Sequence, residues 1–276
     1  MTGTSGLSGA GPVVLIGAGK MGHALAQGWL HAGLANDQLV LVDPHPQSSI
    51  TNFAHEQGIR LLDKVTGEHA RVLVLAVKPQ MMPQVLSELR SSVGPDTLVI
   101  SIAAGISIET LSGGLGTRKI VRTMPNTPAQ LGRGITGAVP ASGIGAADRD
   151  LADALLKAAG DVLWFEDESK IDAVTAVSGS GPAYVFHFVE ALAEAARHQG
   201  FSEEQAMQLA RATVIGAAAL LESDGSPASV LRQNVTSPKG TTAAALDVLM
   251  GEPGLTDLID RTVQAARARS EELGRA

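Results

Sequence analysis

The sequence of 276 residues contains no cysteine. This absence excludes disulfide bonds, thiolate metal sites and cysteine nucleophiles. It also fits a reducing compartment, and we expect the protein to be cytoplasmic. The seven histidines include no His-x-x-x-His or comparable ligand pair. The sequence therefore predicts no metal site.

Aromatic residues and positive charge are also scarce. Aromatics make up 3% of the chain, and the formal net charge at pH 7 is −7. Nucleic-acid binding uses basic surfaces and stacking side chains, so we expect no nucleic-acid partner. The longest apolar stretches, 72–77 and 212–221, are well short of the ~20 residues that a membrane helix needs. Residues 1–11 lack the basic and apolar regions of a signal peptide, and we expect no membrane association.

Short β-branched runs alternate with helical stretches from Val13 onward. Such continuous apolar strands, separated by helices, are typical of a parallel sheet that is covered on both faces. The runs cover residues 13–16, 39–42, 72–77, 97–102 and 119–122. The fold class that they predict is α/β, with a doubly wound Rossmann-type parallel sheet.

Strand-like runs stop near Phe165, and alanine-rich helical segments follow. We expect a flexible tail over residues 1–11, a dinucleotide-binding Rossmann domain over 12–166, and an all-helical domain for substrate binding and dimerisation over 167–276. One helix begins near Pro182 and stops before Gly200. The next begins with a capping box at residues 202–205. A shorter helix follows Pro227, and an amphipathic helix covers about 255–273.

A glycine pattern directly follows the first predicted strand and opens a predicted helix. It consists of Gly17, Ala18, Gly19, Lys20, Met21 and Gly22. The first glycine permits a tight turn, the second allows close backbone approach to a pyrophosphate, and the third allows helix-to-strand packing. The helix N-terminus favours phosphate charge. This context indicates dinucleotide binding, against the alternative of an ordinary glycine turn.

Asp43 ends the second predicted strand, 26 residues after Gly17. An acid at this place can contact the adenosine ribose and favours a free 2′-hydroxyl, so use of NADH or of both cofactors is open. The alternative is that Asp43 only caps a turn.

Small residues follow the third and fourth predicted strands, at the sheet edge where this fold binds its ligand. They leave room for the nicotinamide ribose. The candidate cofactor residues here are Ala76, Val77, Lys78, Pro79, Ala103 and Ala104. Lys78 either contacts the cofactor or is a solvated lysine.

Two segments rich in hydroxyls and glycine open helices in the second half. Residues 176–184 include Ser178 and Gly181, and residues 237–242 include Ser237, Gly240, Thr241 and Thr242. Free backbone N–H groups and hydroxyls at a helix start suit a carboxylate. The alternative is that both segments are only helix caps. Two such segments beside a nucleotide domain favour a small anionic substrate.

Together with residues 122–129, Arg-Thr-Met-Pro-Asn-Thr-Pro-Ala, these segments resemble the pyrroline-5-carboxylate reductase family. The resemblance runs from about Val13 to the final helix. It implies an oxidoreductase that uses NADPH or NADH to reduce the ring C=N bond of 1-pyrroline-5-carboxylate to L-proline, the last step of proline biosynthesis. It also implies homodimers formed by the helical domain, and in many members larger oligomers.

The resemblance also assigns roles to residues. Asn126 would contact the cofactor. Ser178, Gly181, Ser237, Gly240, Thr241 and Thr242 would contact the substrate, and Thr242 would donate a hydrogen bond to the imine nitrogen. Tyr184, His187 and Trp164 are interpreted as packing residues.

Two positions depart from the family pattern. Lys239 stands where the family usually has a glycine, which either alters the backbone or adds a cation near the substrate carboxylate. Asp43 stands where NADPH-preferring members carry a small hydroxyl residue, so the cofactor preference stays open.

Two other functions remain as alternatives. A β-hydroxyacid dehydrogenase or imine reductase of similar plan would need a lysine in the second domain, where Lys170 and Lys239 are the candidates. A nucleotide-sensing regulatory protein would bind the cofactor without turnover, and the intact threonine segment argues against it.

Overall fold

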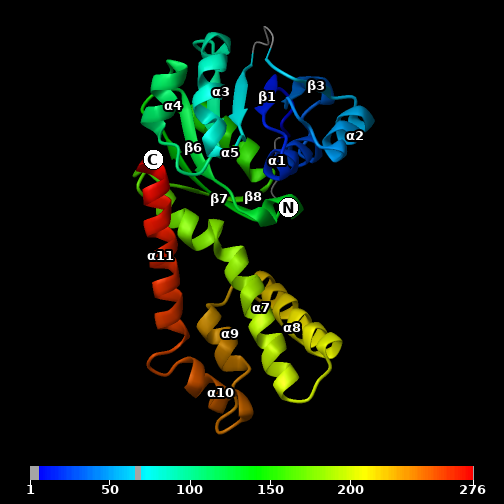
Figure 1. Ribbon diagram of the computed structural model, residues 1–276, viewed down its shortest axis with the longest axis vertical. Helices are drawn as coiled ribbons and strands as arrows, with labels where there is room; N and C mark the ends of the chain where they lie inside the picture. Colours follow the sequence, from blue (N-terminus) through cyan, green and yellow to red (C-terminus); the bar gives the residue numbers. More distant parts are fainter. Residues whose placement is uncertain (1–5, 66–69, 276) are drawn as a thin grey trace. The chain divides into compact units, whose positions relative to one another are not determined.

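The computed structural model describes residues 6–65 and 70–275. Its contacts divide the chain into two compact units, shown in Figure 1. Unit 1 comprises residues 1–179 and 266–276, and unit 2 comprises residues 180–265. The contact boundary thus follows Gly179, whereas the change in sequence texture suggested a boundary after residue 166. No helix in the described ranges is long and apolar enough to cross a membrane.

Unit 1 is built on an eight-stranded sheet with the order β3-β2-β1-β4-β5-β6-β7-β8. Neighbouring strands are parallel except for the antiparallel pair β6 and β7. The strands are β1 Val13–Ile16, β2 Leu39–Val42, β3 Arg60–Leu62, β4 Val72–Leu75, β5 Leu98–Ser101, β6 Ile120–Met124, β7 Gly134–Pro140 and β8 Gly160–Trp164. The doubly wound Rossmann-type sheet expected from the sequence is confirmed.

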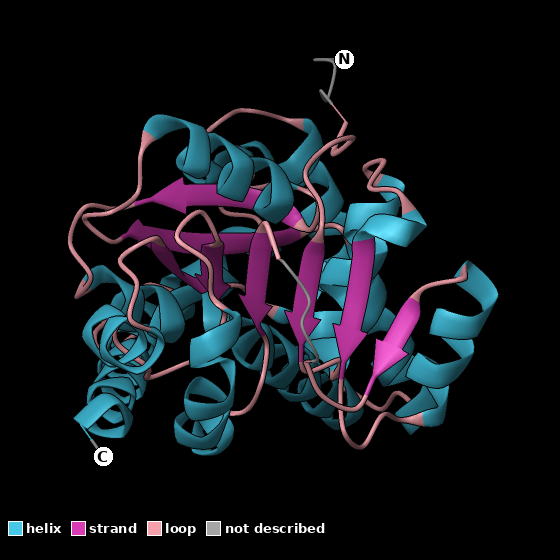
Figure 2. Cartoon of the chain, turned by 90° about the horizontal axis from the view of Figure 1, so that it is seen from above, coloured by secondary structure: helices cyan, strands magenta, loops and turns pink. Residues whose placement is uncertain are grey.

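Helices cover both faces of this sheet, as Figure 2 shows. Alternate residues of β1 enter different cores, with Val13 and Leu15 on one face and Val14 and Ile16 on the other. This is the period of two that a pleated strand imposes. The helices are α1 Lys20–His31, α2 Ser48–Gln57, α3 Met82–Leu89, α4 Ile108–Leu115, α5 Ala146–Lys157 and α6 Lys170–Val174. Short 3-10 turns cover 36–38, 79–81, 90–92 and 127–131, and a π-helical turn covers Thr175–Gly179.

The strand register brings the candidate cofactor residues to one edge. Ile16 pairs with Val42 of β2 and with Leu75 of β4, and Leu75 pairs with Ser101 of β5. The residues that follow these four strand ends therefore begin at the same level of the sheet. This carboxyl edge is where open α/β sheets bind ligands.

Three strands were not expected from the sequence, namely β3, β7 and β8. β3 has three residues, and both β3 and β8 lie at the outer edges of the sheet. Part of the expected tail is also packed, because Leu7 and Ala10 are buried in a core of unit 1 and Leu7 N donates to Ala32 O at 3.0 Å. Residues 1–5 of that tail lie outside the described residues.

Unit 2 is helical. Its helices are α7 Gly181–His198, α8 Glu203–Ser223, α9 Ala228–Asn234 and α10 Thr241–Leu249, and α11 Leu255–Arg275 ends in unit 1. The capping box predicted at the start of α8 is present, because Gln205 N donates to Ser202 Oγ at 3.3 Å and Ser202 N donates to Gln205 Oε1 at 3.1 Å.

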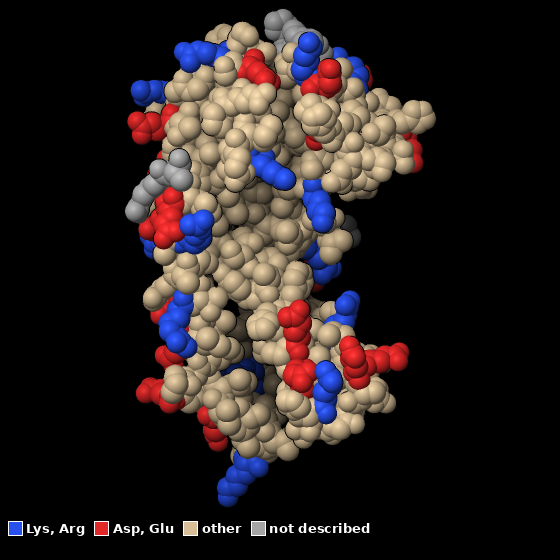
Figure 3. Space-filling model, in the orientation of Figure 1, with Lys and Arg blue, Asp and Glu red and all other residues tan. Residues whose placement is uncertain are grey.

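The core of unit 2 is small, and its helices expose large apolar side chains. Ala193, Ala206 and Ala210 form its buried cluster. Phe186 on α7 and Ile215 on α8 are 65% and 63% exposed. Figure 3 shows acidic and basic side chains interspersed on the face drawn, with no large patch of one sign.

Candidate active site

The glycine loop has the backbone conformation that its glycines were expected to permit. Gly17 has φ +89°, and a Cβ there would lie 2.8 Å from Ala76 O on the neighbouring strand end. A Cβ on Gly22 would overlap the carbonyl oxygen of Gly17. Both positions therefore require glycine, the first for its φ and contact and the second for contact alone.

The middle of the loop is open. A Cβ on Gly19 would meet nothing within 4 Å. Gly19 is the N-cap of α1, and no side chain caps this helix. The first N–H groups of α1 are thus available to an anion, and the helix dipole favours negative charge there. This open glycine cradle at an uncapped helix start fits the pyrophosphate of a dinucleotide.

Asp43 joins the glycine loop to the turn after β2. Its Oδ2 accepts from Ala18 N at 3.0 Å, and its Oδ1 accepts from His45 N at 2.9 Å. The carboxylate therefore does cap a turn. Each oxygen keeps acceptor capacity, and the half-buried side chain stands at the ligand edge of the sheet, so contact with a ribose remains a prediction.

The other candidate cofactor residues lie at the same edge. Ala76 N donates to Ile16 O at 2.8 Å, which places the segment Ala76–Pro79 beside the glycine loop. Lys78 is exposed. Ala103 is buried, whereas Ala104 is half-buried in the loop between β5 and α4. The structure thus brings these segments to one edge, while their contacts with a cofactor remain predictions.

Asn126 has a role within the chain that the sequence did not indicate. The side chain is buried, and its Oδ1 accepts from Ile135 N at 3.0 Å. This bond joins the end of β6 to the beginning of β7. Asn126 therefore fixes the backbone at the carboxyl end of β6, whether or not its amide also contacts the cofactor.

The predicted substrate turn of unit 2 leads into α10. Gly240 is the N-cap of this helix and has no side-chain cap. Ser237, Thr241 and Thr242 hydroxyls make no hydrogen bond within the described part of the chain. Thr242 is half-buried, and Ser237 and Thr241 are exposed. Three hydroxyls and the first N–H groups of a helix are thus available to a carboxylate.

Lys239 in this turn has φ +60°. It is the one non-glycine residue with positive φ in the described ranges, at a position where glycine has no steric penalty. The backbone thus keeps a left-handed conformation despite the lysine.

The second predicted substrate segment crosses the unit boundary. Ser178 lies in the π-helical turn of unit 1, and its Oγ donates to Val174 O at 3.1 Å. Its hydroxyl can therefore offer a substrate only an acceptor while this bond is kept. Gly181 begins α7 of unit 2.

The residues interpreted as packing have local partners. Trp164 Nε1 donates to Asp153 Oδ1 at 2.9 Å, and the Arg149 guanidinium lies 4.7 Å from the centroid of the same ring. His187 is exposed, with its Nδ1 3.0 Å from Glu190 Oε2. Within the described residues, no group of three or more His, Asp or Glu side chains could hold a metal ion.

One buried polar atom near the glycine loop has no signal in the sequence. His23 Nε2 on α1 is buried without a hydrogen-bond partner among the described residues. The ring lies edge-on to Phe53, with centroids 4.6 Å apart. Burial lowers the pKa of His23 below its usual value, because it disfavours the charged ring.

Two family descriptions match the chain. Residues 168–273 match "Pyrroline-5-carboxylate reductase dimerisation", and residues 12–105 match "NADP oxidoreductase coenzyme F420-dependent". A pyrroline-5-carboxylate reductase of Pseudomonas aeruginosa is 41% identical over 265 residues, which cover 95% of this chain and 96% of that protein.

Solved structures agree with these matches. A pyrroline-5-carboxylate reductase of Coxiella burnetii has a TM-score of 0.87 and 34% identity, with 96% of this chain and 98% of that chain covered. A Plasmodium falciparum pyrroline carboxylate reductase with NADP bound has a TM-score of 0.80 and 28% identity, over 95% of this chain and 97% of that chain. The chain belongs to the pyrroline-5-carboxylate reductase family.

Proposed function

We propose that the protein reduces the ring C=N bond of 1-pyrroline-5-carboxylate to give L-proline, the last step of proline biosynthesis, with NADPH or NADH as the reductant. The observation that carries this proposal is the turn before α10. There, three hydroxyls without a hydrogen-bond partner among the described residues and an uncapped helix start are available to a small acid. It stands in a chain that matches a pyrroline-5-carboxylate reductase along 95% of its length.

The carboxyl edge of the sheet in unit 1 would hold the cofactor. The open cradle at Gly19 and the N–H groups of Lys20 and Met21 would bind the pyrophosphate, and Asp43 would face the adenosine ribose. The segments Ala76–Pro79 and Ala103–Ala104, with Asn126, would line the remaining length of the site. The bound nicotinamide supplies the hydride.

The turn before α10 would hold the substrate. Ser237, Thr241 and the first N–H groups of α10 would bind the carboxylate, with Ser178 and Gly181 contributing from the second segment. Thr242 would donate a hydrogen bond to the ring nitrogen and so fix the face of the imine carbon. Reduction adds one hydride to carbon and needs one proton on nitrogen. A threonine hydroxyl is too weak an acid to be the source, so Thr242 would relay a proton from solvent or orient an already protonated imine.

Self-association would cover the exposed apolar faces of unit 2, since the match over residues 168–273 is to a dimerisation domain. The absence of cysteine supports a cytoplasmic location, as expected for a reducing compartment.

The direct experiment is a steady-state assay at the nicotinamide absorbance band with 1-pyrroline-5-carboxylate and each cofactor. Substrate-dependent oxidation of NADPH or NADH is the expected result. No oxidation with either cofactor, despite measurable cofactor binding, would favour a nucleotide-sensing protein. Turnover of β-hydroxyacids instead would favour the dehydrogenase alternative.

The variant Thr242→Ala tests the role of the hydroxyl. Removing a donor that contacts the reacting nitrogen should lower kcat by about 10²-fold, the lower end of the effect of removing one positioned donor. Cofactor affinity, measured by the fluorescence of bound NADPH, should be unchanged. Thr213→Ala on α8 is the matched control, because its hydroxyl donates only within its own helix, to Leu209 O at 2.8 Å. Equal kcat in the two variants would contradict the assignment.

A further inference from the structure

The loop from Ala103 to Ser107 carries two of the proposed cofactor residues, yet it belongs to no helix or strand. It connects the end of β5 to the start of α4. Its conformation therefore depends on the contacts made around it. Those contacts come from two segments far along the chain, around Glu168 and at the end of α11.

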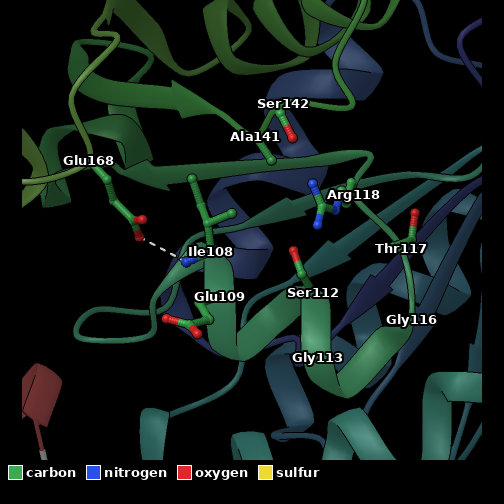
Figure 4. Close-up of a pocket in the computed structure, with 10 residues that line it drawn as sticks. All are labelled: Ile108, Glu109, Ser112, Gly113, Gly116, Thr117, Arg118, Ala141, Ser142 and Glu168. Carbon is green, nitrogen blue, oxygen red and sulfur yellow. Dashed lines mark hydrogen bonds between the residues drawn. The ribbon is translucent and has the colours of Figure 1, made fainter.

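Glu168 fixes the end of the loop. Its Oε1 accepts from Ile108 N, the first residue of α4, at 2.8 Å, and Figure 4 shows this bond. The Ser107 side chain accepts from Thr110 N at 3.0 Å. Two N–H groups of the first turn of α4 are thus satisfied, one of them by a carboxylate in the position that the helix dipole favours.

Arg122 holds Glu168 in place. Its Nη1 lies 2.6 Å from the same Oε1, and the arginine side chain is 7% exposed while that of Glu168 is 33% exposed. Arg122 extends from β6, a central strand, so the carboxylate is tied to the rigid sheet. Glu168 also lines an open groove of about 600 Å³ beside α4. Figure 4 labels the residues that line this groove.

The last turns of α11 lie near the middle of the loop. Gly105 has φ +74°, and a Cβ on it would lie 3.5 Å from backbone atoms of Leu273 and Gly274. Ser270 Oγ donates to Asp172 Oδ1 of α6 at 2.7 Å, and Ser270 is buried. The end of α11 is thereby attached to α6, which begins two residues after Glu168.

These links form a ring that includes the second half of the loop, from Gly105 to Ile108. The ring passes from Glu168 to the start of α4, along the loop to Gly105, from there to the end of α11, and through Ser270 and Asp172 back to α6. All of its members belong to unit 1. The ring restrains the end of the loop that leads into α4, whereas the other end follows β5, where Ala103 N donates to Ser101 Oγ at 3.4 Å.

We propose that Glu168 and the end of α11 are positioning elements of the cofactor site, which hold the loop Ala103–Ser107 in the conformation that receives the nicotinamide ribose. This inference rests on the proposed function, because it assumes that Ala103 and Ala104 contact the cofactor. Neither Glu168 nor Ser270 touches the cofactor in this proposal. Both act by fixing the backbone that does.

The test compares Glu168→Ala with Glu168→Gln in the full-length protein. The amide oxygen of glutamine can still accept from Ile108 N, whereas alanine cannot. We expect the Kd for NADPH, measured by fluorescence without substrate, to rise about fivefold in Glu168→Ala, the effect of losing one hydrogen bond. Glu168→Gln should bind within about twofold of wild type. The KM for the cofactor should follow Kd, while kcat at saturation stays near wild type.

Alanine at position 168 leaves the Arg122 charge buried and unpaired, which can prevent folding. In that case Arg122→Met/Glu168→Ala replaces the single variant, because it removes the cation and the acceptor together. Glu166→Ala is the matched control, since Glu166 is 83% exposed and, among the residues that the structure describes, pairs only with Arg149, at 3.4 Å. An unchanged Kd in the folded Ala variant, or an equal loss in the Ala and Gln variants, would overturn the role of Glu168.

Ser270→Ala tests the other arm of the ring, with Ser223→Ala at the end of α8 as its control. Ser223 Oγ donates to Leu220 O within its own helix at 3.1 Å. We expect a rise in the Kd for NADPH of about twofold to fivefold in Ser270→Ala and none in the control. Equal Kd values would overturn the role of α11. Because binding is measured without substrate, wild-type protein that binds NADPH but does not reduce pyrroline-5-carboxylate would refute the proposed function and leave this test valid.

Discussion

Asp43 shows how one side chain can serve the fold and the ligand together. Its two oxygens accept from Ala18 N and His45 N, so it links the glycine loop to the turn after β2. In the proposed cofactor site, the carboxylate charge would lie where a 2′-phosphate would be bound. Among residues 44–49 the only ionisable side chain is His45.

The variant Asp43→Ser should therefore shift the preference toward NADPH. Like charges about 4 Å apart repel by roughly 1–4 kcal/mol, so the NADPH-to-NADH ratio of kcat/KM should rise at least about fivefold. Steady-state kinetics with both cofactors measures this ratio. Asp43→Asn is the control, because it removes the charge and keeps an acceptor for one backbone N–H. A ratio that stays constant in both variants would mean that Asp43 does not read the ribose.

His23 gives a pH dependence of stability whose sign follows from its burial. The folded state lowers the pKa of His23, so below the unfolded pKa of about 6.5 the unfolded chain binds more protons than the folded one. The neutral ring makes its whole contribution to the free energy of unfolding above that pH, and this contribution is lost as the pH falls through the folded pKa.

The variant His23→Phe removes this titration and keeps a ring against Phe53. When the pH is lowered from 7.5 to 5.5, we expect the Tm of wild type to fall by a few degrees more than the Tm of the variant. The reason is that 1 kcal/mol corresponds to about 2–4 °C in a chain of this size class. Differential scanning calorimetry at both values measures it. A Tm difference independent of pH would contradict the assignment.

At the scale of the element, two glycines of the glycine loop are needed for different reasons, Gly22 for helix packing and Gly19 for the proposed approach of the cofactor. Gly22→Ala would place a Cβ against Gly17 O, so the helix must move away from the strand. Gly19→Ala meets no protein atom within 4 Å and has an ordinary φ of −64°. We expect Gly22→Ala to lower stability and cofactor affinity together, and Gly19→Ala to keep the wild-type Tm while its Kd for NADPH rises at least about tenfold. Normal NADPH binding by folded Gly19→Ala would place the pyrophosphate elsewhere.

The strands that could be predicted share one property: they are buried on both faces. β1, β2, β4 and β5 are buried at every position, which gives continuous β-branched or leucine runs. β7 begins with Gly134 and contains Gly137, so its sequence has the composition of a turn. A Cβ at Gly137 would lie 2.8 Å from Val174 of α6, which explains the glycine only once the tertiary contact is known.

The candidate site also has parts that local sequence patterns indicate and parts that depend on tertiary contacts. The glycine loop and the turn before α10 could be proposed as binding segments from the sequence, because each is a run of adjacent residues. Two hydrogen bonds could not be found in this way: Ile135 N donates to Asn126 Oδ1 across nine positions, and Ile108 N donates to Glu168 Oε1 across 60 positions. No spacing rule relates such pairs, and only the folded backbone brings them together.

At the scale of the whole molecule, the apolar helices of unit 2 require a partner. The buried apolar cluster of unit 2 consists of three alanines. A cluster of this size removes too little apolar surface from water to stabilise the helices of the unit by itself. Large apolar side chains stand on α7 and α8 at Phe186, Phe188, Ile215 and Leu220. Contiguous surfaces of this kind mark protein interfaces, in agreement with the match to a dimerisation domain.

We therefore expect Ile215→Asp on α8 and Phe186→Asp on α7 to dissociate the dimer. In a twofold-symmetric interface each substitution acts twice, and burying one such side chain contributes roughly 1.5–3 kcal/mol, so the dimer dissociation constant should rise at least about 10²-fold. Light scattering coupled to size-exclusion chromatography over a concentration series measures the change. Leu163→Asp on β8 is the control. Leu163 is 52% exposed in unit 1, so this substitution also places a carboxylate at an exposed apolar position, but outside the helical unit. If both helical variants remain dimeric at the concentrations where wild type is, these faces of α7 and α8 are not the dimer interface, and another surface of unit 2 must form it.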